Sequence, residues 1–129
     1  MISTPSDLVT SLFDSSARPA DLQLMPVISA RAAFQDVLHE RCLLVDARPR
    51  RRRTVEGEVS EELTPIRLDA LGPADQLKGE RVVVLGADAL TSSAVREVLV
   101  RNGARRVEEI GGGFGAWLAA GLPVATRVA

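Results

Sequence analysis

Hydrophobic residues along this chain gather in short runs that are separated by stretches of mixed polarity. Val82–Leu85 consists of four apolar residues in succession, and Leu43–Val45 is a second run of this kind. A strand that is apolar at every position has to be covered on both faces, as happens in parallel sheets. Pro26–Ile28 is a short strand or lead-in, Ile66–Leu68 is a weaker strand candidate, and Val107–Ile110 is a further strand. The pattern therefore predicts five strands.

Between these runs, apolar residues recur at the three- and four-residue spacing of an amphipathic helix. The spacing predicts one helix after Ser29, whose side chain can cap its start, and another over about 92–102, followed by a terminating glycine at Gly103. A third helix starts at the Gly111–Gly113 turn. The residues expected to face inwards are Ala33, Phe34, Val37 and Leu38 in the first helix, Val95, Val98 and Leu99 in the second, and Phe114, Trp117 and Leu118 in the third.

Strand and helix thus alternate through most of the chain, which predicts an α/β domain with a mainly parallel sheet. We place this domain at residues 26–129. Residues 1–25 are rich in Ser, Thr, Pro and Asp and form an N-terminal extension, for which we expect a short helix over 6–13 and a linker over 15–19.

Composition narrows the functional classes. The length of 129 residues fits one domain, and the net charge of −1 gives no general attraction to nucleic acid or to acidic membranes. No apolar run approaches the ~20 residues of a membrane span, and the N-terminus lacks the features of a secretory signal, so we expect a cytoplasmic location. A single cysteine and a single histidine exclude an internal disulfide and argue against a metal site, and we expect no cofactor.

Candidate chemistry lies where strands end. In an open parallel sheet, ligands bind at the carboxyl ends of the strands. Three segments follow predicted strands in this way, namely Asp46–Arg48, Gly86–Thr91 and Gly111–Gly113. We expect them to meet at one edge of the sheet.

Four motifs follow one another along the chain: Leu44–Arg48 with its Asp-x-Arg ending, the apolar strand Val82–Leu85, Gly111–Trp117 with Gly-Gly-x-x-x-Trp, and Ala120–Val124 with Ala-Gly-x-Pro-Val. In this order and spacing they resemble the rhodanese family of sulfurtransferases, over about three quarters of the chain. The resemblance implies a rhodanese-like three-layer α/β/α fold with a five-stranded, mostly parallel sheet.

The resemblance also implies where the catalytic cysteine of active members would stand, directly after the strand that enters the active-site loop. There the loop amides and the following helix N-terminus lower the thiol pKa, and the thiolate carries sulfur as a persulfide. In this chain the position is Gly86. Because loss of the nucleophile costs on the order of 10⁶ in kcat in a protease, we expect no sulfurtransferase activity.

The vestigial active-site loop consists of Gly86, Ala87, Asp88, Ala89, Leu90, Thr91 and Ser92. Asp88 brings a negative charge into the loop, Thr91 stands where the family often has arginine, and Glu58 stands where it usually has histidine. By the same resemblance, Asp46 and Arg48 brace the loops. Since amides at a helix N-terminus point to one spot whatever the side chains are, we still expect an anion cradle in this loop.

Cys42 is not expected to replace the missing nucleophile. It lies four residues before Asp46 on the same strand, which at about 3.3 Å per residue is roughly 13 Å from the carboxyl end. Burial should also keep its thiol protonated and unreactive.

Arg50–Arg53 is a dense run of positive charge with two interpretations. It could form an anion-binding patch near the mouth of the loop, or a solvated loop whose charge nearby glutamates balance. The glutamates are Glu56, Glu58, Glu61 and Glu62. We favour the solvated loop.

Three functional hypotheses remain, and we favour the first. A catalytically inactive rhodanese-like module would bind a partner protein or a small anion in a regulatory or scaffolding role. A sulfurtransferase-related enzyme with different chemistry would have to use Asp88, Thr91, Ser92 or Ser93, with no histidine nearby to activate it. A structural unit would assemble through the N-terminal extension, and a homo-oligomer is compatible with that role.

Overall fold

The computed structural model describes residues 25–73 and 75–125. The helix and linker expected in the N-terminal extension lie outside these ranges. Within the ranges, no helix has the length and apolar character that crossing a membrane requires.

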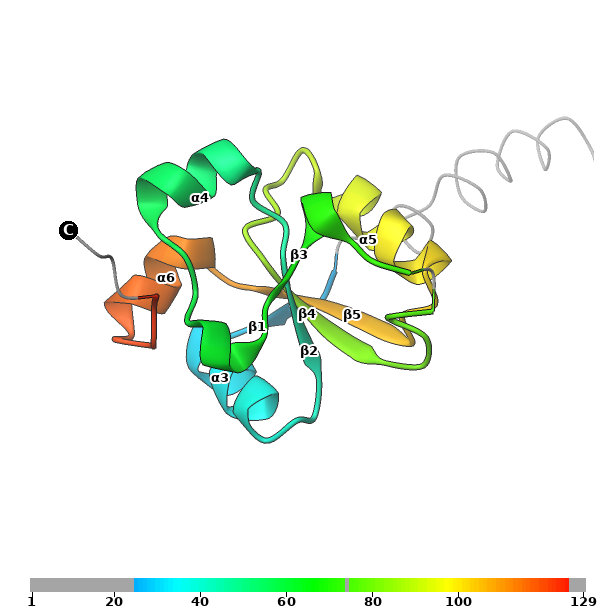
Figure 1. Ribbon diagram of the computed structural model, residues 1–129, viewed down its shortest axis with the longest axis horizontal. Coiled ribbons are helices and arrows are strands. Elements are labelled where there is room, and N and C mark those ends of the chain that lie inside the picture. The colour runs from blue at the N-terminus through cyan, green and yellow to red at the C-terminus, as the bar shows by residue number, and fades with distance from the viewer. Residues whose placement is uncertain (1–24, 74, 126–129) are drawn as a thin grey trace, which may run out of the picture.

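One five-stranded sheet runs through the middle of the domain, and all of its strand pairs are parallel (Figure 1). The strands are β1 (Val27–Ile28), β2 (Leu43–Asp46), β3 (Ile66–Arg67), β4 (Arg81–Leu85) and β5 (Arg106–Ile110), in the spatial order β1-β5-β4-β2-β3. The five strands predicted from the hydrophobic pattern are confirmed. Because Asp46 is level with Leu85 in the sheet, β2 and β4 end side by side.

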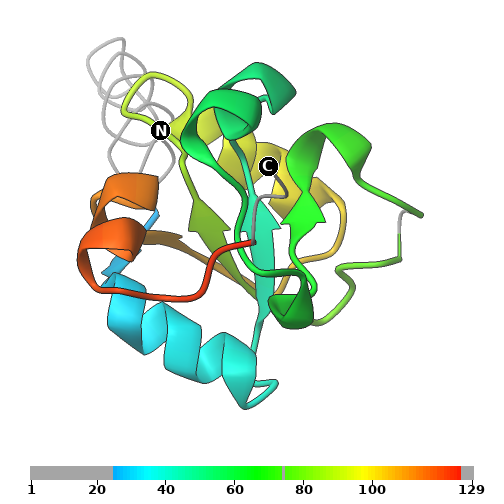
Figure 2. The same ribbon diagram turned by 60° about the vertical axis from the view of Figure 1, so that its left-hand side comes forward.

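The described residues form four α-helices, namely α3 (Ala30–Leu38), α4 (Arg50–Glu56), α5 (Ser92–Arg101) and α6 (Gly113–Ala119). Helices α3 and α6 pack on one face of the sheet and α5 packs on the other (Figure 2). Two short 3₁₀ turns, η2 (Glu61–Leu63) and η3 (Leu68–Ala70), flank β3. This is the three-layer α/β/α arrangement that the sequence predicts.

The hydrophobic core is divided by the sheet, and β4 supplies both halves. Val83 and Leu85 face α3 and α6, whereas Val82 and Val84 face α5. All four are 0% exposed. The alternation follows from the period of two in a strand, and it explains why every position of β4 is apolar.

The three predicted helices are present, but three of the residues predicted to face inwards are exposed. Ser29 caps α3 by accepting a hydrogen bond from the Ala32 amide. The helical spacing predicts that Leu38, Val98 and Leu118 are covered, but they are 49%, 39% and 50% exposed. Each lies at the flank of its helix's apolar stripe, where the helix surface turns away from the sheet.

The Arg50–Arg53 run is helical, so the prediction of a solvated loop is wrong. Arginine is a good helix former, and α4 begins directly after Pro49. Its single buried residue is Arg53. A helix whose inner face is an arginine shows no hydrophobic period, which is why the sequence pattern does not reveal it.

Candidate functional site

Gly86 lies directly after β4, at the carboxyl edge of the sheet. Its φ of +87° is in the left-handed region that glycine adopts without strain. A Cβ atom added at this position would lie 2.3 Å from Cγ of Arg48. The space beside Gly86 is therefore already occupied by the Arg48 side chain.

Arg48 is 0% exposed, and each nitrogen of its guanidinium group donates a hydrogen bond. Its Nε and Nη2 donate to the two carboxylate oxygens of Asp46 at 3.0 and 2.7 Å, and its Nη1 donates to Glu56 at 3.2 Å. The guanidinium carbon lies 4.1 Å from the centre of the Phe114 ring. The two-point bond and the aromatic face hold this arginine in one place, because its planar fork matches both.

The loop after Gly86 folds around the carboxylate of Asp88. One oxygen, Oδ1, accepts hydrogen bonds from the amides of Leu90 and Thr91, both at 2.9 Å, and from the Thr91 hydroxyl at 3.0 Å. These bonds, with that of the Thr91 hydroxyl the largest cause, lower the pKa of Asp88. At these two amides the prediction of a cradle for an external anion is wrong, because the chain's own carboxylate fills it. Aspartate commonly bonds the backbone just ahead of it in this way.

Arg53 joins α4 to its neighbours. Its Nη1 donates to the Arg48 carbonyl oxygen at 2.7 Å and to Asp69 at 3.2 Å, and its Nε donates to Glu58 at 3.3 Å. One buried guanidinium thereby fixes the segment after β2, the segment after α4 and the 3₁₀ turn η3 relative to each other.

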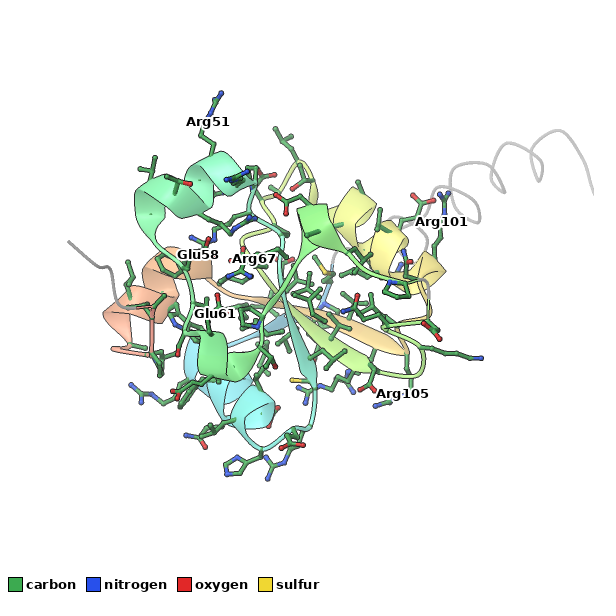
Figure 3. The ribbon with its side chains drawn as sticks, viewed as in Figure 1. Arg51, Glu58, Glu61, Arg67, Arg101 and Arg105 are labelled. Carbon is green, nitrogen blue, oxygen red and sulfur yellow. The ribbon has the colours of Figure 1, made fainter. Side chains whose placement is uncertain are left out.

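Glu58, which the sequence resemblance places at a usual histidine position, belongs to this charged network. It accepts a hydrogen bond from Arg67 at 3.4 Å, and Arg67 also donates to Glu61 at 2.6 Å. Figure 3 shows these three side chains together, whereas Arg51 points outwards from α4. Glu58 therefore serves as an acceptor for arginines on two sides.

A cleft of about 510 Å³ opens between this loop and the start of α6. Small or apolar residues line most of it, namely Gly86, Ala87, Ile110, Gly112, Gly113, Phe114, Gly115 and Leu118. The charged residues of the wall are Arg52, Glu56, Asp88 and Glu109. Three acidic residues thus line the cleft, against one arginine.

The three carboxylates are held in different ways. Burial acts against ionisation of Glu56, but hydrogen bonds from Arg52 and Arg48 lower its pKa. Asp88 is bonded within its own loop. Glu109, half-buried near the end of β5, accepts a hydrogen bond at 3.2 Å from the hydroxyl of buried Ser92.

A second hollow of about 470 Å³ lies on the other side of the loop, against α5. Its apolar lining consists of Ala47, Pro49, Leu68, Ala94, Val95 and Val98. Arg52, Gly86 and Asp88 line both hollows, so the two adjoin across the loop. We call the first hollow the cleft and the second the apolar groove.

Comparison with solved structures places this arrangement in a known fold. The chain is similar to the polysulfide-sulfur transferase homodimer of Wolinella succinogenes, with 20% identity, 92% of this chain and 93% of that chain covered, and a TM-score of 0.59. The single-domain sulfurtransferase RDL2 of Saccharomyces cerevisiae gives 16% identity, 77% and 93% coverage, and a TM-score of 0.52. The fold is rhodanese-like.

A third similar structure has no assigned function. It is RPA3614 of Rhodopseudomonas palustris, a protein of unknown function and possible tyrosine phosphatase, with 19% identity, 96% and 98% coverage, and a TM-score of 0.60. No family model matches the chain, and no curated protein matches it in sequence. At these identities the rhodanese-like domain shares the scaffold of the three proteins, and its activity has to be argued from its own residues.

The cysteine of the rhodanese-like domain lies away from the cleft. Cys42 directly precedes β2, at the amino edge of the sheet, whereas Gly86 follows the carboxyl end of the neighbouring strand β4. The side chain is buried, as the sequence predicts, and burial raises the pKa of its thiol to about 11.

The rhodanese-like domain brings together some of the predicted site residues and separates others. Asp46, Arg48 and Gly86 meet in one packed unit. Leu90 points to solvent, 94% exposed, and Ser92 is buried with its hydroxyl bonded to Glu109.

Several residues of the cleft are absent from the site predicted from the sequence, among them Glu56, Glu109 and Phe114, whereas Arg52 was considered only as part of the Arg50–Arg53 charge run. Arg52 and Glu56 belong to the unpredicted helix α4. Glu109 could have been found, because it is a charged residue next to the carboxyl end of a predicted strand, where ligands bind in this class of sheet.

Proposed function

We propose that this rhodanese-like domain is a non-catalytic module that binds a partner protein at the cleft after β4. One observation carries the proposal, the packing of Arg48 against Gly86. Sulfur transfer through a persulfide needs a thiolate at the end of β4. Gly86 supplies no sulfur, and the Cγ of Arg48 leaves no room for a side chain there.

Asp46 and Arg48 are braces of the site in this proposal. Both side chains are at most 1% exposed, and two hydrogen bonds join the Arg48 guanidinium to the Asp46 carboxylate. A buried polar network whose members are all bonded is rigid. The braces therefore keep the rim of the cleft in a fixed shape although no reaction takes place there.

Cys42 offers no alternative nucleophile. A thiol whose pKa is raised to about 11 is almost wholly protonated at neutral pH. The cleft is also at the opposite edge of the sheet, so a donor bound in the cleft cannot reach the sulfur.

A protein partner suits the site better than a small anion. The cleft has more carboxylates than arginines, and Asp88 occupies the loop amides that an anion would need. The adjoining apolar groove favours the side chains of a second protein, because a concave apolar surface with a few polar groups is typical of binding sites.

The test is a sulfurtransferase assay with thiosulfate as donor and cyanide as acceptor. We expect no more thiocyanate than heat-inactivated protein yields, and we expect Gly86→Cys to remain near that level because Arg48 and Asp88 still fill the loop. Turnover clearly above the heated control that persists in Cys42→Ser would overturn the proposal.

A further inference from the structure

We infer that the partner presents a basic side chain to the cleft and apolar side chains to the apolar groove. The inference rests on the proposed binding function and names the chemistry of the bound segment. It depends on the charge of the cleft wall, on the adjoining apolar surface, and on which groups already have partners.

The charge of the cleft favours a cation. Glu56 is engaged by Arg48 and Arg52, and Asp88 is engaged by its own loop. Among the described residues no cationic side chain pairs with Glu109, whose carboxylate accepts a single side-chain hydrogen bond, from the Ser92 hydroxyl. A half-buried carboxylate in a concave wall attracts an ammonium or guanidinium group more strongly than a fully solvated one does.

The lining next to Glu109 suits the stem of such a side chain. Lysine and arginine lay their methylene groups on apolar surface while the charged end seeks a partner. Leu118 is half exposed at the wall of the cleft, and Gly112, Gly113 and Gly115 leave the wall without protruding side chains.

The apolar groove lies within reach of the next residues of the same segment, because Gly86 and Asp88 line both hollows. Val98 reaches this groove from α5 with 39% of its surface exposed. Burying the exposed surface of Val98 is favourable, and an apolar side chain of the partner would bury it. The fitting partner is therefore a segment in which basic and apolar residues alternate.

The experiment titrates the full-length protein, labelled with ¹⁵N, with a capped hexapeptide of alternating leucine and arginine, and follows the amide resonances. Two matched peptides serve as controls. One alternates leucine with glutamate, which reverses the charge, and one alternates serine with arginine, which removes the apolar part. We expect only the leucine–arginine peptide to bind well, with shifts at Gly86–Asp88, Glu109 and Val98.

Matched variants separate the cleft from general surface charge and hydrophobicity. Glu109→Gln should weaken the leucine–arginine peptide about fivefold, the upper range for one ion pair near the surface, whereas Glu97→Gln on the solvent side of α5 should not. Val98→Ser should weaken it about threefold or more, since part of one apolar side chain is lost. Val100→Ser, which removes a similarly exposed valine outside the groove, should leave the affinity unchanged.

The inference is overturned by equal binding of the leucine–glutamate peptide, by shifts that map away from the two hollows, or by no binding of the leucine–arginine peptide. It is also overturned if the same resonances shift with protein concentration alone, because the occupant would then be a second copy of the chain. These failures leave the proposed binding function standing. Sulfurtransferase turnover in the assay above would instead remove the proposed function itself.

Discussion

Gly86 carries two independent constraints, a left-handed backbone and a side-chain position that another residue fills. Its φ is +87°, and the Cγ of Arg48 lies 2.3 Å from the place of a Cβ. Only glycine meets both conditions without distortion. These two facts make the position sensitive to any substitution.

Gly86→Ala should lower the free energy of unfolding by about 2–4 kcal/mol, the sum of left-handed strain and overpacking. Gly79→Ala is the matched control, because Gly79 has a φ of +74° and no atom within 4 Å of an added Cβ. It should cost only the backbone part, about 1–2 kcal/mol. Urea unfolding of both variants measures the difference, and equal costs would show that Arg48 does not fill the position.

Cys42 should make stability fall at high pH. Burial raises the pKa of its thiol from the ordinary 9.0 to about 11, so the folded state keeps a proton that the unfolded state loses between these values. The stabilisation is complete below pH 9, is lost progressively as pH rises, and amounts to roughly 2–3 kcal/mol.

The chain is well suited to this measurement, because it has no tyrosine and Lys78 is its one lysine, so few other side chains titrate in that range. The unfolding free energy is measured from pH 8 to pH 11 for the wild type and for Cys42→Ala, which lacks the titrating group. A parallel decline in the two proteins, or rapid labelling of the native thiol, would show that Cys42 is accessible.

At the scale of elements, α4 is held by charge where α3, α5 and α6 are held by apolar packing. Its single buried side chain is Arg53, which bonds the Arg48 carbonyl, Glu58 and Asp69. The helix supplies Arg52 and Glu56 to the cleft, so its position determines the shape and charge of one wall.

Arg53→Ala should therefore lower the unfolding free energy by about 1.5–3 kcal/mol, the range for a lost charge-assisted bond. Arg51→Ala removes an exposed arginine from the same helix and should stay within about 0.5 kcal/mol of the wild type. Arg53→Lys should rescue little, because lysine lacks the planar fork that reaches three acceptors. Similar effects at positions 51 and 53 in denaturant unfolding would contradict this account of how α4 docks.

The contrast between helices shows what can be predicted from sequence. The strands and three of the helices carry an apolar period that local pattern detects, and Asp46, Arg48 and Gly86 follow from motif order. Helix α4 shows no such period, because its position depends on ion pairs between segments far apart in the chain. The contact of Glu109 with Ser92 likewise depends on the fold, although its place beside the end of a predicted strand could have drawn attention to it. The sequence shows that Asp88 brings a charge into the loop. That its carboxylate accepts hydrogen bonds from the loop amides depends on how the turn folds.

At the scale of the whole molecule, the sheet separates two apolar clusters, and the cleft and the apolar groove lie at its carboxyl edge. The clusters lie beside α3 and α6 on one side and beside α5 on the other. The similar solved structures share this scaffold at 16–20% identity. The scaffold is therefore shared, and what the carboxyl edge of the sheet does in this domain depends on its own residues.

The order of the strands has a consequence for biosynthesis. Within the described residues, the first strand of the sheet, β1, pairs only with the last, β5, through the bonds from the Glu109 amide to the Pro26 carbonyl and from the Gly111 amide to the Ile28 carbonyl. While a ribosome makes the chain, β1 emerges early and has no partner until β5 follows. Parallel pairing of such distant segments is slow, and the apolar surface stays exposed to chaperones meanwhile.

Nascent chains arrested with β5 still inside the ribosomal exit tunnel should therefore be digested rapidly by protease. Chains extended by a linker that lets β5 emerge should become resistant, because the sheet can then close around its central strands. The measurement is a protease time course on ribosomes arrested at successive lengths. Resistance gained before β5 has emerged would mean that the earlier strands form a stable unit alone, and that the domain is assembled during translation rather than at its end.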